Sequence, residues 1–144
     1  MSVDYGDVRT GIAVCDKNEF LASPICVIQE RDPQKLAEKV AALAVQYKPE
    51  QIAVGLPKNM DGSEGFRADA CREFAALLSG KVSAEIVMRD ERLTTVSAYK
   101  YMNMTDTRGK KRRETVDAVA AVIILEDYLT YRKNKRSDQI QMNK

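Results

Sequence analysis

The chain has 144 residues, of which 44% are hydrophobic and 31% are charged, as expected for one globular domain with a sizeable core. It has no histidine and only three cysteines. This composition excludes Ser-His and Cys-His nucleophilic mechanisms, and it leaves no plausible zinc site or disulfide framework. The longest apolar run, Ala118–Leu125, is too short to span a bilayer, so we expect a cytoplasmic protein without a membrane partner.

The net charge of +2 is distributed unevenly along the chain. Residues 89–113 carry a net charge of +5 and residues 131–144 a net charge of +4, whereas the remainder carries −7. Two basic segments on an acidic body indicate a polyanionic partner.

The first third of the chain predicts three consecutive strands. Residues 1–5 and 10–15 are short apolar segments separated by a glycine-containing turn. Residues 20–29 are rich in β-branched side chains, and Pro24 predicts an edge or bulged strand there. Short links between the three segments favour an antiparallel meander.

The middle of the chain alternates helices and strands. Asp32 and Pro33 predict a helix N-terminus, and Lys48-Pro49 predicts its end. Strands are expected at 51–55 and 84–88. The helix between them is expected to start from a cap at Ser63. The residues expected on the buried faces of the two helices are Leu36, Val40, Leu43 and Tyr47, and Phe66, Ala70, Phe74 and Leu77.

The last third predicts a helix from Thr94 or Thr95, a polar basic loop over 103–113, a helix over 114–131 and a disordered basic tail over 134–144. The order β-β-β-α-β-α-β-α-α predicts an α/β fold with a mixed sheet and helices on its faces. We expect a single domain over residues 1–133.

Three acidic residues stand where acids are unusual. Asp4 interrupts the first strand, Glu91 follows the carboxyl end of a buried strand, and Asp117 shares a helical face with apolar residues. Each has a simpler explanation. Asp4 can form an Asx turn, Glu91 can pair with Arg89 or Arg92 on the surface, and Asp117 can pair with a cation.

Carboxylates that converge from separate segments are hard oxygen ligands, which suit Mg²⁺ or Mn²⁺. Two such ions can clamp the attacking and leaving oxygens of a phosphoryl displacement. This chemistry needs no histidine, and it would give the basic segments a phosphate backbone to bind.

Four motifs together resemble the YqgF/RuvX family, whose RNase H-like members are related to Holliday-junction resolvases and are assigned to pre-16S rRNA processing. They are VDYG..RTG at 3–11, GLPKNMDGSEG at 55–65, DERLTT at 90–95 and VDAVAAVIILEDYL at 116–129. Two positions depart from the family pattern. Thr10 replaces an apolar residue, and only three residues precede Asp4, from which we expect either a start codon a few residues upstream or a shortened form of the protein.

The resemblance implies an RNase H-like fold: a five-stranded mixed sheet whose first three strands are antiparallel, with helices on both faces. By motif matching it implies that Asp4, Glu91 and Asp117 form a catalytic, metal-binding triad. Residues expected to contact nucleic acid are Arg9, Lys58, Asn59, Arg92, Arg108, Lys110, Lys111, Arg112 and Arg113.

The implied function is a metal-dependent endonuclease for structured RNA, acting at the 5′ end of pre-16S rRNA during ribosome biogenesis. Resolution of branched DNA is a variant of the same chemistry, and we expect a monomer or a weak homodimer. A non-catalytic nucleic-acid-binding assembly factor and a phosphotransferase are the alternatives from other classes. The second would need another domain to close over a nucleotide.

Overall fold

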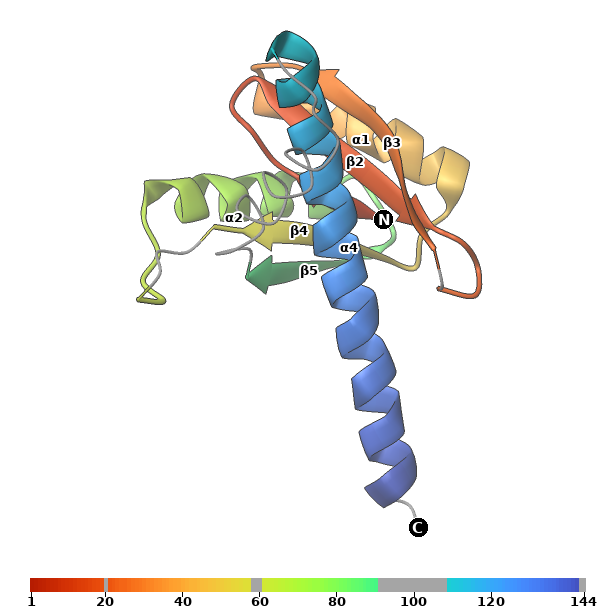
Figure 1. The fold of residues 1–144 in the computed structure, drawn as a ribbon. Helices are drawn as coiled ribbons and strands as arrows, with labels where there is room; N and C mark the ends of the chain where they lie inside the picture. Colours follow the sequence, from red (N-terminus) through yellow and green to blue (C-terminus); the bar gives the residue numbers. More distant parts are fainter. Residues whose placement is uncertain (20, 58–60, 91–108, 143–144) are drawn as a thin grey trace.

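The computed structural model describes residues 1–19, 21–57, 61–90 and 109–142, with side chains over 119–137 in the last segment (Figure 1). The described elements are β1 (Ser2–Asp4), β2 (Arg9–Cys15), β3 (Ala22–Gln29), α1 (Pro33–Tyr47), β4 (Gln51–Leu56), α2 (Phe66–Ser79), β5 (Glu85–Asp90) and α4 (Gly109–Met142). The strands form one sheet in the order β3-β2-β1-β4-β5, so the first strand of the chain lies at the centre.

One half of the sheet is antiparallel. Val3 of β1 pairs with Ile12 of β2, and β2 pairs in turn with β3. The register between β2 and β3 shifts after Ile12, and Pro24 lies opposite Ala13 at this irregularity. The predicted meander is therefore confirmed, and so is the placement of Pro24 on an irregular edge strand, where its missing N–H costs little.

The other half of the sheet is parallel. Val3 also pairs with Val54 of β4, and Gly55 of β4 pairs with Arg89 of β5. Because β1, β4 and β5 run in the same direction, their carboxyl ends meet at one edge of the sheet. This edge is where open sheets with parallel strands place their ligands.

Helices cover both faces of the sheet (Figure 1). Under α1 and α2 lies the larger core, where Val3, Ile12 and Ile52 pack with Leu36 and Phe74. On the opposite face α4 packs across the strands. Ala121 and Leu125 meet Ala13 there, while Ile124 and Tyr128 meet Ala53. The mixed sheet with helices on both faces agrees with the predicted fold class.

Helix α1 forms as the sequence predicts. The Asp32 carboxylate accepts hydrogen bonds from the backbone N–H groups of Gln34 (2.9 Å) and Lys35 (3.5 Å), and Pro33 is the first helical residue. Lys48 ends the helix in the left-handed conformation, with φ of 50°. Leu36 and Val40 are buried, but Tyr47 at the end of the predicted face is 39% exposed.

The start and buried face of α2 differ from the prediction. Gly65, not Ser63, is the N-cap, and Phe66 is 83% exposed instead of facing the core. The residues buried against the sheet and α1 are Ala68, Cys71, Phe74, Ala75 and Leu78. Phe74 belongs to both the predicted and the observed buried face. The predicted residues Ala70 and Leu77 lie one position before the buried residues Cys71 and Leu78.

Helix α4 is longer than predicted at both ends. It begins at Gly109, inside the expected loop over 103–113, and continues to Met142 through residues expected to form a disordered tail. Lysine, arginine, glutamine and methionine are good helix formers, and the packed central turns provide a nucleus from which the helix can propagate. The rest of the expected loop, and the helix expected from Thr94 or Thr95, lie outside the described residues.

The cysteines behave as small, mostly buried side chains. Cys71 is buried and Cys15 and Cys26 are half-buried, and none of the three forms a disulfide. Burial raises the pKa of the Cys15 and Cys26 thiols, which keeps both protonated at neutral pH. Within the described part of the chain, no helix has the length and apolarity that crossing a bilayer requires.

Candidate active site

Asp4 is the last residue of the central strand β1, where its backbone lies opposite Gly11 of β2. Val3 points into the core beneath α1 and α2. Because side chains alternate along a strand, Ser2 and Asp4 share the other face, which α4 covers. The Ser2 hydroxyl donates a 2.6 Å hydrogen bond to the backbone carbonyl of Ala121 in α4, and Asp4 is half-buried.

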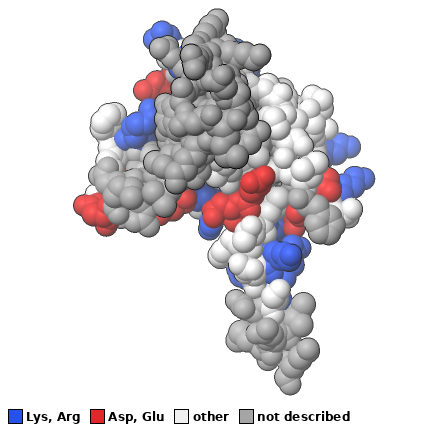
Figure 2. Space-filling model, viewed as in Figure 1, with Lys and Arg blue, Asp and Glu red and all other residues white. Residues whose placement is uncertain are grey.

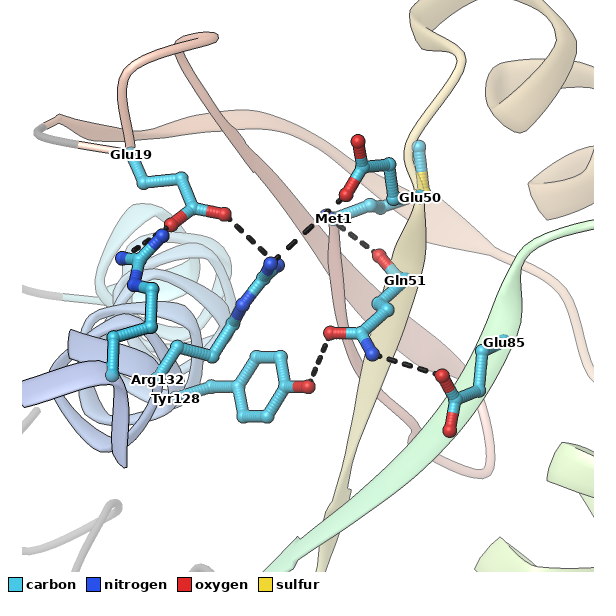
Figure 3. Close-up of polar contacts among 8 residues, drawn as sticks. Met1, Glu19, Glu50, Gln51, Glu85, Tyr128 and Arg132 are labelled. Atoms are coloured by element: carbon cyan, nitrogen blue, oxygen red, sulfur yellow. Dashed lines mark hydrogen bonds and ion pairs between the residues drawn. The ribbon is translucent and has the colours of Figure 1, made fainter. Parts of the chain in front are cut away.

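Contacts at Met1 define how β1 and α4 run past each other. Met1 donates from its amino group to the Gln51 carbonyl (3.2 Å), and the Tyr128 hydroxyl donates to the Gln51 side-chain oxygen (Figure 3). Met1 thus lies near Tyr128, whereas Ser2 meets Ala121, seven residues earlier in the helix. Moving along β1 toward Asp4 therefore moves along α4 toward its N-terminus. The backbone of Asp117 lies one turn before Ala121, but its side chain lies outside the described residues.

Strand β5 extends to Asp90, two residues beyond its predicted end. Arg89 faces α4, where its Nε and Nη2 atoms lie 3.2 and 2.7 Å from Oδ2 of Asp127. Its guanidinium also lies over the rings of Tyr128 and Tyr131, at 5.8 and 4.7 Å from their centroids. Arg89 thus has Asp127 as an ion-pair partner. Glu91, the next residue after β5, lies outside the described residues.

The turn between β1 and β2 is closed by side chains that the sequence analysis did not single out as important. The Gly6 N–H donates to the hydroxyl of Thr10, which is fully buried (3.2 Å). Arg67 of α2 donates to the Tyr5 carbonyl and to the Asp7 carboxylate, both at 3.2 Å. A hydroxyl four residues after a glycine is a recognisable turn signal, but the contribution of Arg67 depends on tertiary structure.

Gly6 is required by its surroundings. A Cβ atom there would lie 2.1 Å from the carbonyl oxygen of Arg9. The absence of a side chain at Gly6 therefore lets the chain turn closely beside Asp4. Tyr5, between these two residues, stacks on Phe74 with 4.6 Å between the ring centroids, and burial raises the pKa of its hydroxyl.

The loop after β4 is only partly described. Asp61 accepts from the backbone N–H (2.9 Å) and hydroxyl (2.6 Å) of Ser63, and Gly62 has φ of 89°. These features indicate a turn at Asp61-Gly62. The predicted contact residues Lys58 and Asn59 lie outside the described residues.

The remaining predicted contact residues are distributed between β2 and α4. Arg9 begins β2 opposite Gln29 and is half-buried. Lys110, Lys111, Arg112 and Arg113 belong to the backbone of the first turns of α4, while Arg92 and Arg108 lie outside the described part. Among the side chains that the structure describes, no three acids or cysteines form a metal-binding cluster. Two members of the proposed triad are not among those side chains, so the triad remains a prediction.

Comparison with known proteins gives consistent matches over most of the chain. A family model described as RuvX, Holliday junction resolvase, matches residues 1–131. A protein of Halothermothrix orenii named “Putative pre-16S rRNA nuclease” is 42% identical over 131 residues, covering 91% of this chain and 94% of its own. A protein of Agathobacter rectalis with the same name is 36% identical over 140 residues, covering 95% and 98%.

Solved structures confirm the RNase H-like fold. The RuvC protein of T. thermophilus in complex with a Holliday junction substrate aligns with a TM-score of 0.60 at 12% identity, covering 92% of this chain and 93% of that one. The Fowlpox virus resolvase bound to Holliday junction DNA aligns with a TM-score of 0.51 at 13% identity, covering 90% and 95%. With the family match over residues 1–131, these findings show that the chain belongs to the RuvX family of nucleases, described as Holliday junction resolvases.

Proposed function

We propose that this chain is a divalent-metal-dependent endonuclease that hydrolyses phosphodiester bonds of structured RNA and acts at the 5′ end of pre-16S rRNA. The observation that carries the proposal is the position of Asp4. This half-buried carboxylate ends the central strand on the face that α4 covers, at the edge where three parallel strands end. The RNA substrate is supported by the names of the two bacterial relatives.

The path of α4 favours Asp117 as a partner of Asp4. Ser2 meets Ala121, and Asp4 is two residues further along β1, which is about 7 Å in a strand. Position 117 is four residues before Ala121, which is about 6 Å in a helix, and it shares a helical face with positions 121, 124 and 128. Because α4 crosses β1 with its earlier turns toward the Asp4 end of the strand, both displacements lead toward the same edge of the sheet.

The alternation of β5 favours Glu91 as the third acid. Val87 packs in the cluster with Ile124 and Tyr128, and Arg89 contacts Asp127, so positions 87 and 89 face α4. Position 91 is the next in this alternation. Strands β1 and β5 lie on either side of β4, so they are separated by about 10 Å. The side chains of Asp4 and Glu91 can bridge this distance around shared ions.

The donor set fits magnesium or manganese. Three carboxylates without histidine or a cysteine pair are hard oxygen donors, which select these cations over zinc. When bound, divalent cations supply Lewis-acid stabilisation of the attacking and leaving oxygens. The role of the chain is to fix the acids in place: β1 holds Asp4 on a paired backbone, and Gly6 turns the chain away directly after Tyr5.

The basic start of α4 would hold the substrate backbone. Lysines and arginines in the first turns of a helix are placed unfavourably against the helix dipole, and no acid in the first turn compensates them. Phosphate groups would remove this cost. Such contacts provide affinity that falls with salt concentration and little sequence selectivity.

A cleavage assay tests the proposal. Wild type, Asp4→Asn and Glu91→Gln are compared on structured RNA that carries the 5′ leader of 16S rRNA, with Mg²⁺ or Mn²⁺ and with chelator. Glu38→Gln is the matched control, because it removes an exposed carboxylate from α1 on the other face of the sheet. We expect wild type and control to cleave only with metal, and both site variants to lose at least about 100-fold in rate, since each removes a ligand of the reacting centre.

The same panel separates the alternative functions. A four-way DNA junction is included because the family is described as Holliday junction resolvase. Cleavage of the junction and not of the RNA would support the resolvase alternative. RNA binding without turnover by wild type would indicate an assembly factor, and undiminished cleavage by Asp4→Asn would contradict the assignment of the site.

A further inference from the structure

The C-terminal part of α4 projects beyond the sheet (Figure 1). The helix has 34 residues, which corresponds to a length of about 51 Å. We call residues 130–137 the α4 arm. All of its side chains are exposed except that of Arg132, which is half-buried. The match to the family model ends at residue 131, near the start of the arm.

The arm is basic along its whole described length. It contains Arg132, Lys133, Lys135 and Arg136 and no acidic residue, and basic side chains are visible on the projecting helix in Figure 2. Four cations within five positions include pairs three and four residues apart. Like charges at these spacings repel each other and destabilise a helix.

The fold neutralises only part of this charge. Glu19, in the turn between β2 and β3, lies 2.9 Å from Arg132 (Figure 3). The same carboxylate lies 2.9 Å from Arg136. Arg132 also lies 4.0 Å from Glu50, so both guanidinium groups have acidic partners. Among the described residues, neither Lys133 nor Lys135 has an acid within ion-pair distance. Around the helix axis, one lysine lies on each side of the paired arginines. Positive charge therefore remains on both sides of Arg132 and Arg136.

The helix dipole does not explain the basic arm. Cations stabilise a helix when they lie in its last turn, but α4 continues six residues beyond Arg136. The exposed residues Glu126 and Asp127 precede the arm, and Asp127 is paired with Arg89. The arm is therefore separate from the basic residues that begin the helix.

Resting on the nuclease function proposed above, we infer that the α4 arm is a second phosphate-binding surface that contacts the RNA substrate away from the cleaved bond. Position 133 lies sixteen residues after position 117, which is about 24 Å along the helix. With the spacing of about 3.4 Å between successive nucleotides of a DNA strand as a guide, this distance corresponds to at least about seven nucleotides. RNA that extends this far from the cleavage site reaches the lysines, and shorter RNA does not.

The test measures RNA affinity in the full chain carrying Asp4→Asn, so that bound RNA stays intact. Lys133→Ala/Lys135→Ala is compared on hairpins that extend about four or about twelve base pairs from the cleavage site. Lys35→Ala/Lys81→Ala is the matched control, because it removes two exposed lysines from the other side of the molecule and leaves the same net charge. Circular dichroism checks that each protein is folded.

We expect the arm variant to bind the long hairpin about tenfold more weakly at ~0.1 M salt and to lose about 1–2 from the slope of log affinity against log salt. Its affinity for the short hairpin, and both affinities of the control, should not change. Equal affinity of the arm variant for the long hairpin overturns the inference, and so does an equal loss in the control. Unchanged RNA affinity with lost binding to phosphatidylserine vesicles would assign the arm to an anionic membrane instead.

Failure of this inference is distinguishable from failure of the nuclease proposal. The binding assay uses a protein that does not cleave, whereas the cleavage panel leaves the arm intact. A wild type that cleaves leader RNA while the arm variant binds normally would contradict only the inference about the arm.

Discussion

The hydroxyl of Ser2 donates a 2.6 Å hydrogen bond to the backbone carbonyl of Ala121, joining the first strand to the last helix across 119 residues of sequence. Both residues are fully buried. This bond sets the register of β1 against α4, on which the proposed meeting of Asp4 and Asp117 depends. Stability and catalysis should therefore respond together when the bond is removed.

Replacement Ser2→Ala should lower the free energy of unfolding by about 1 kcal/mol, the usual contribution of one buried hydrogen bond. It should also lower kcat more than KM, because a small shift of α4 would alter the geometry of the acids. Urea denaturation and cleavage kinetics measure the two effects. Ser79→Ala, at the exposed end of α2, is the control, and equal stability of Ser2→Ala and wild type would contradict the prediction.

Replacement Gly6→Ala should open the turn beside Asp4. The new methyl group would lie 2.1 Å from the Arg9 carbonyl oxygen, a backbone atom that cannot rotate away. We expect a loss of about 1–3 kcal/mol of stability and of most cleavage activity. Gly80→Ala is the matched control, since its Cβ would lie an ordinary 3.6 Å from the nearest atom. Similar thermal melts and activities for the two variants would show that the turn is not tightly constrained.

Divalent metal should stabilise the folded protein. Carboxylates that converge without metal repel one another, and an ion that binds only the folded state shifts the unfolding equilibrium by mass action. At a metal concentration about 100-fold above Kd this is about 2.7 kcal/mol, or several degrees in Tm for a chain of this size. Scanning calorimetry should show the shift in wild type and Glu38→Gln and lose it in Asp4→Asn. The same shift in all three proteins would place the metal elsewhere.

Glu30 gives stability a defined pH dependence. Its carboxylate accepts from Lys39 Nζ (3.0 Å) and from the backbone N–H groups of Arg31 (3.1 Å) and Asp32 (3.2 Å). The Lys39 hydrogen bond is the main reason that the pKa of Glu30 is lowered from its ordinary value of 4.5. This contribution is therefore fully present above pH 4.5 and is lost as the pH falls through the lowered pKa of the folded state.

Denaturation of wild type and Glu30→Gln between pH 7 and pH 3 measures this contribution. The stability difference between the two proteins should be constant above pH 4.5 and should decrease below it. Lys39→Met removes the cationic partner of Glu30 and should therefore weaken the same pH dependence. A difference that does not change with pH would show that Glu30 titrates normally in the folded protein.

Local sequence signals predicted much of the fold. Asp32-Pro33 and Lys48-Pro49 mark both ends of α1, and Pro24 marks the irregular edge strand, because each acts through its own backbone geometry. The face of α2 was harder to assign. Phe66 and Phe74 are eight residues apart and fit one helical stripe, yet only Phe74 is buried. The apolar residues of α2 fit two helical faces about equally well. The direction in which the chain leaves β4 determines which of the two faces is buried.

The bounds of α4 depend on effects that local patterns do not contain. Gly109 and the run of like charges after it are weak helix signals, and the exposed residues after Tyr131 have no core to face. Both end segments of α4 extend a helix that is nucleated by the central turns packed on the sheet. For the site, Asp4 was predictable as a candidate because an acid is unusual in a strand, and the structure places that strand at the centre of the sheet. The tertiary contacts of Ser2 and Arg67 had no comparable signal.

The topology of the sheet has a consequence for synthesis of the protein on the ribosome. Strand β1 is translated first, yet its parallel neighbour begins about 50 residues later and its covering helix reaches Ala121 only near the end of translation. Contacts so distant in sequence form late, because the intervening chain must be made before they can close. A polypeptide released early would hold Asp4 on an uncovered strand and lack position 117. With the proposed triad as the active site, premature termination should therefore produce an inert fragment and not an unregulated nuclease.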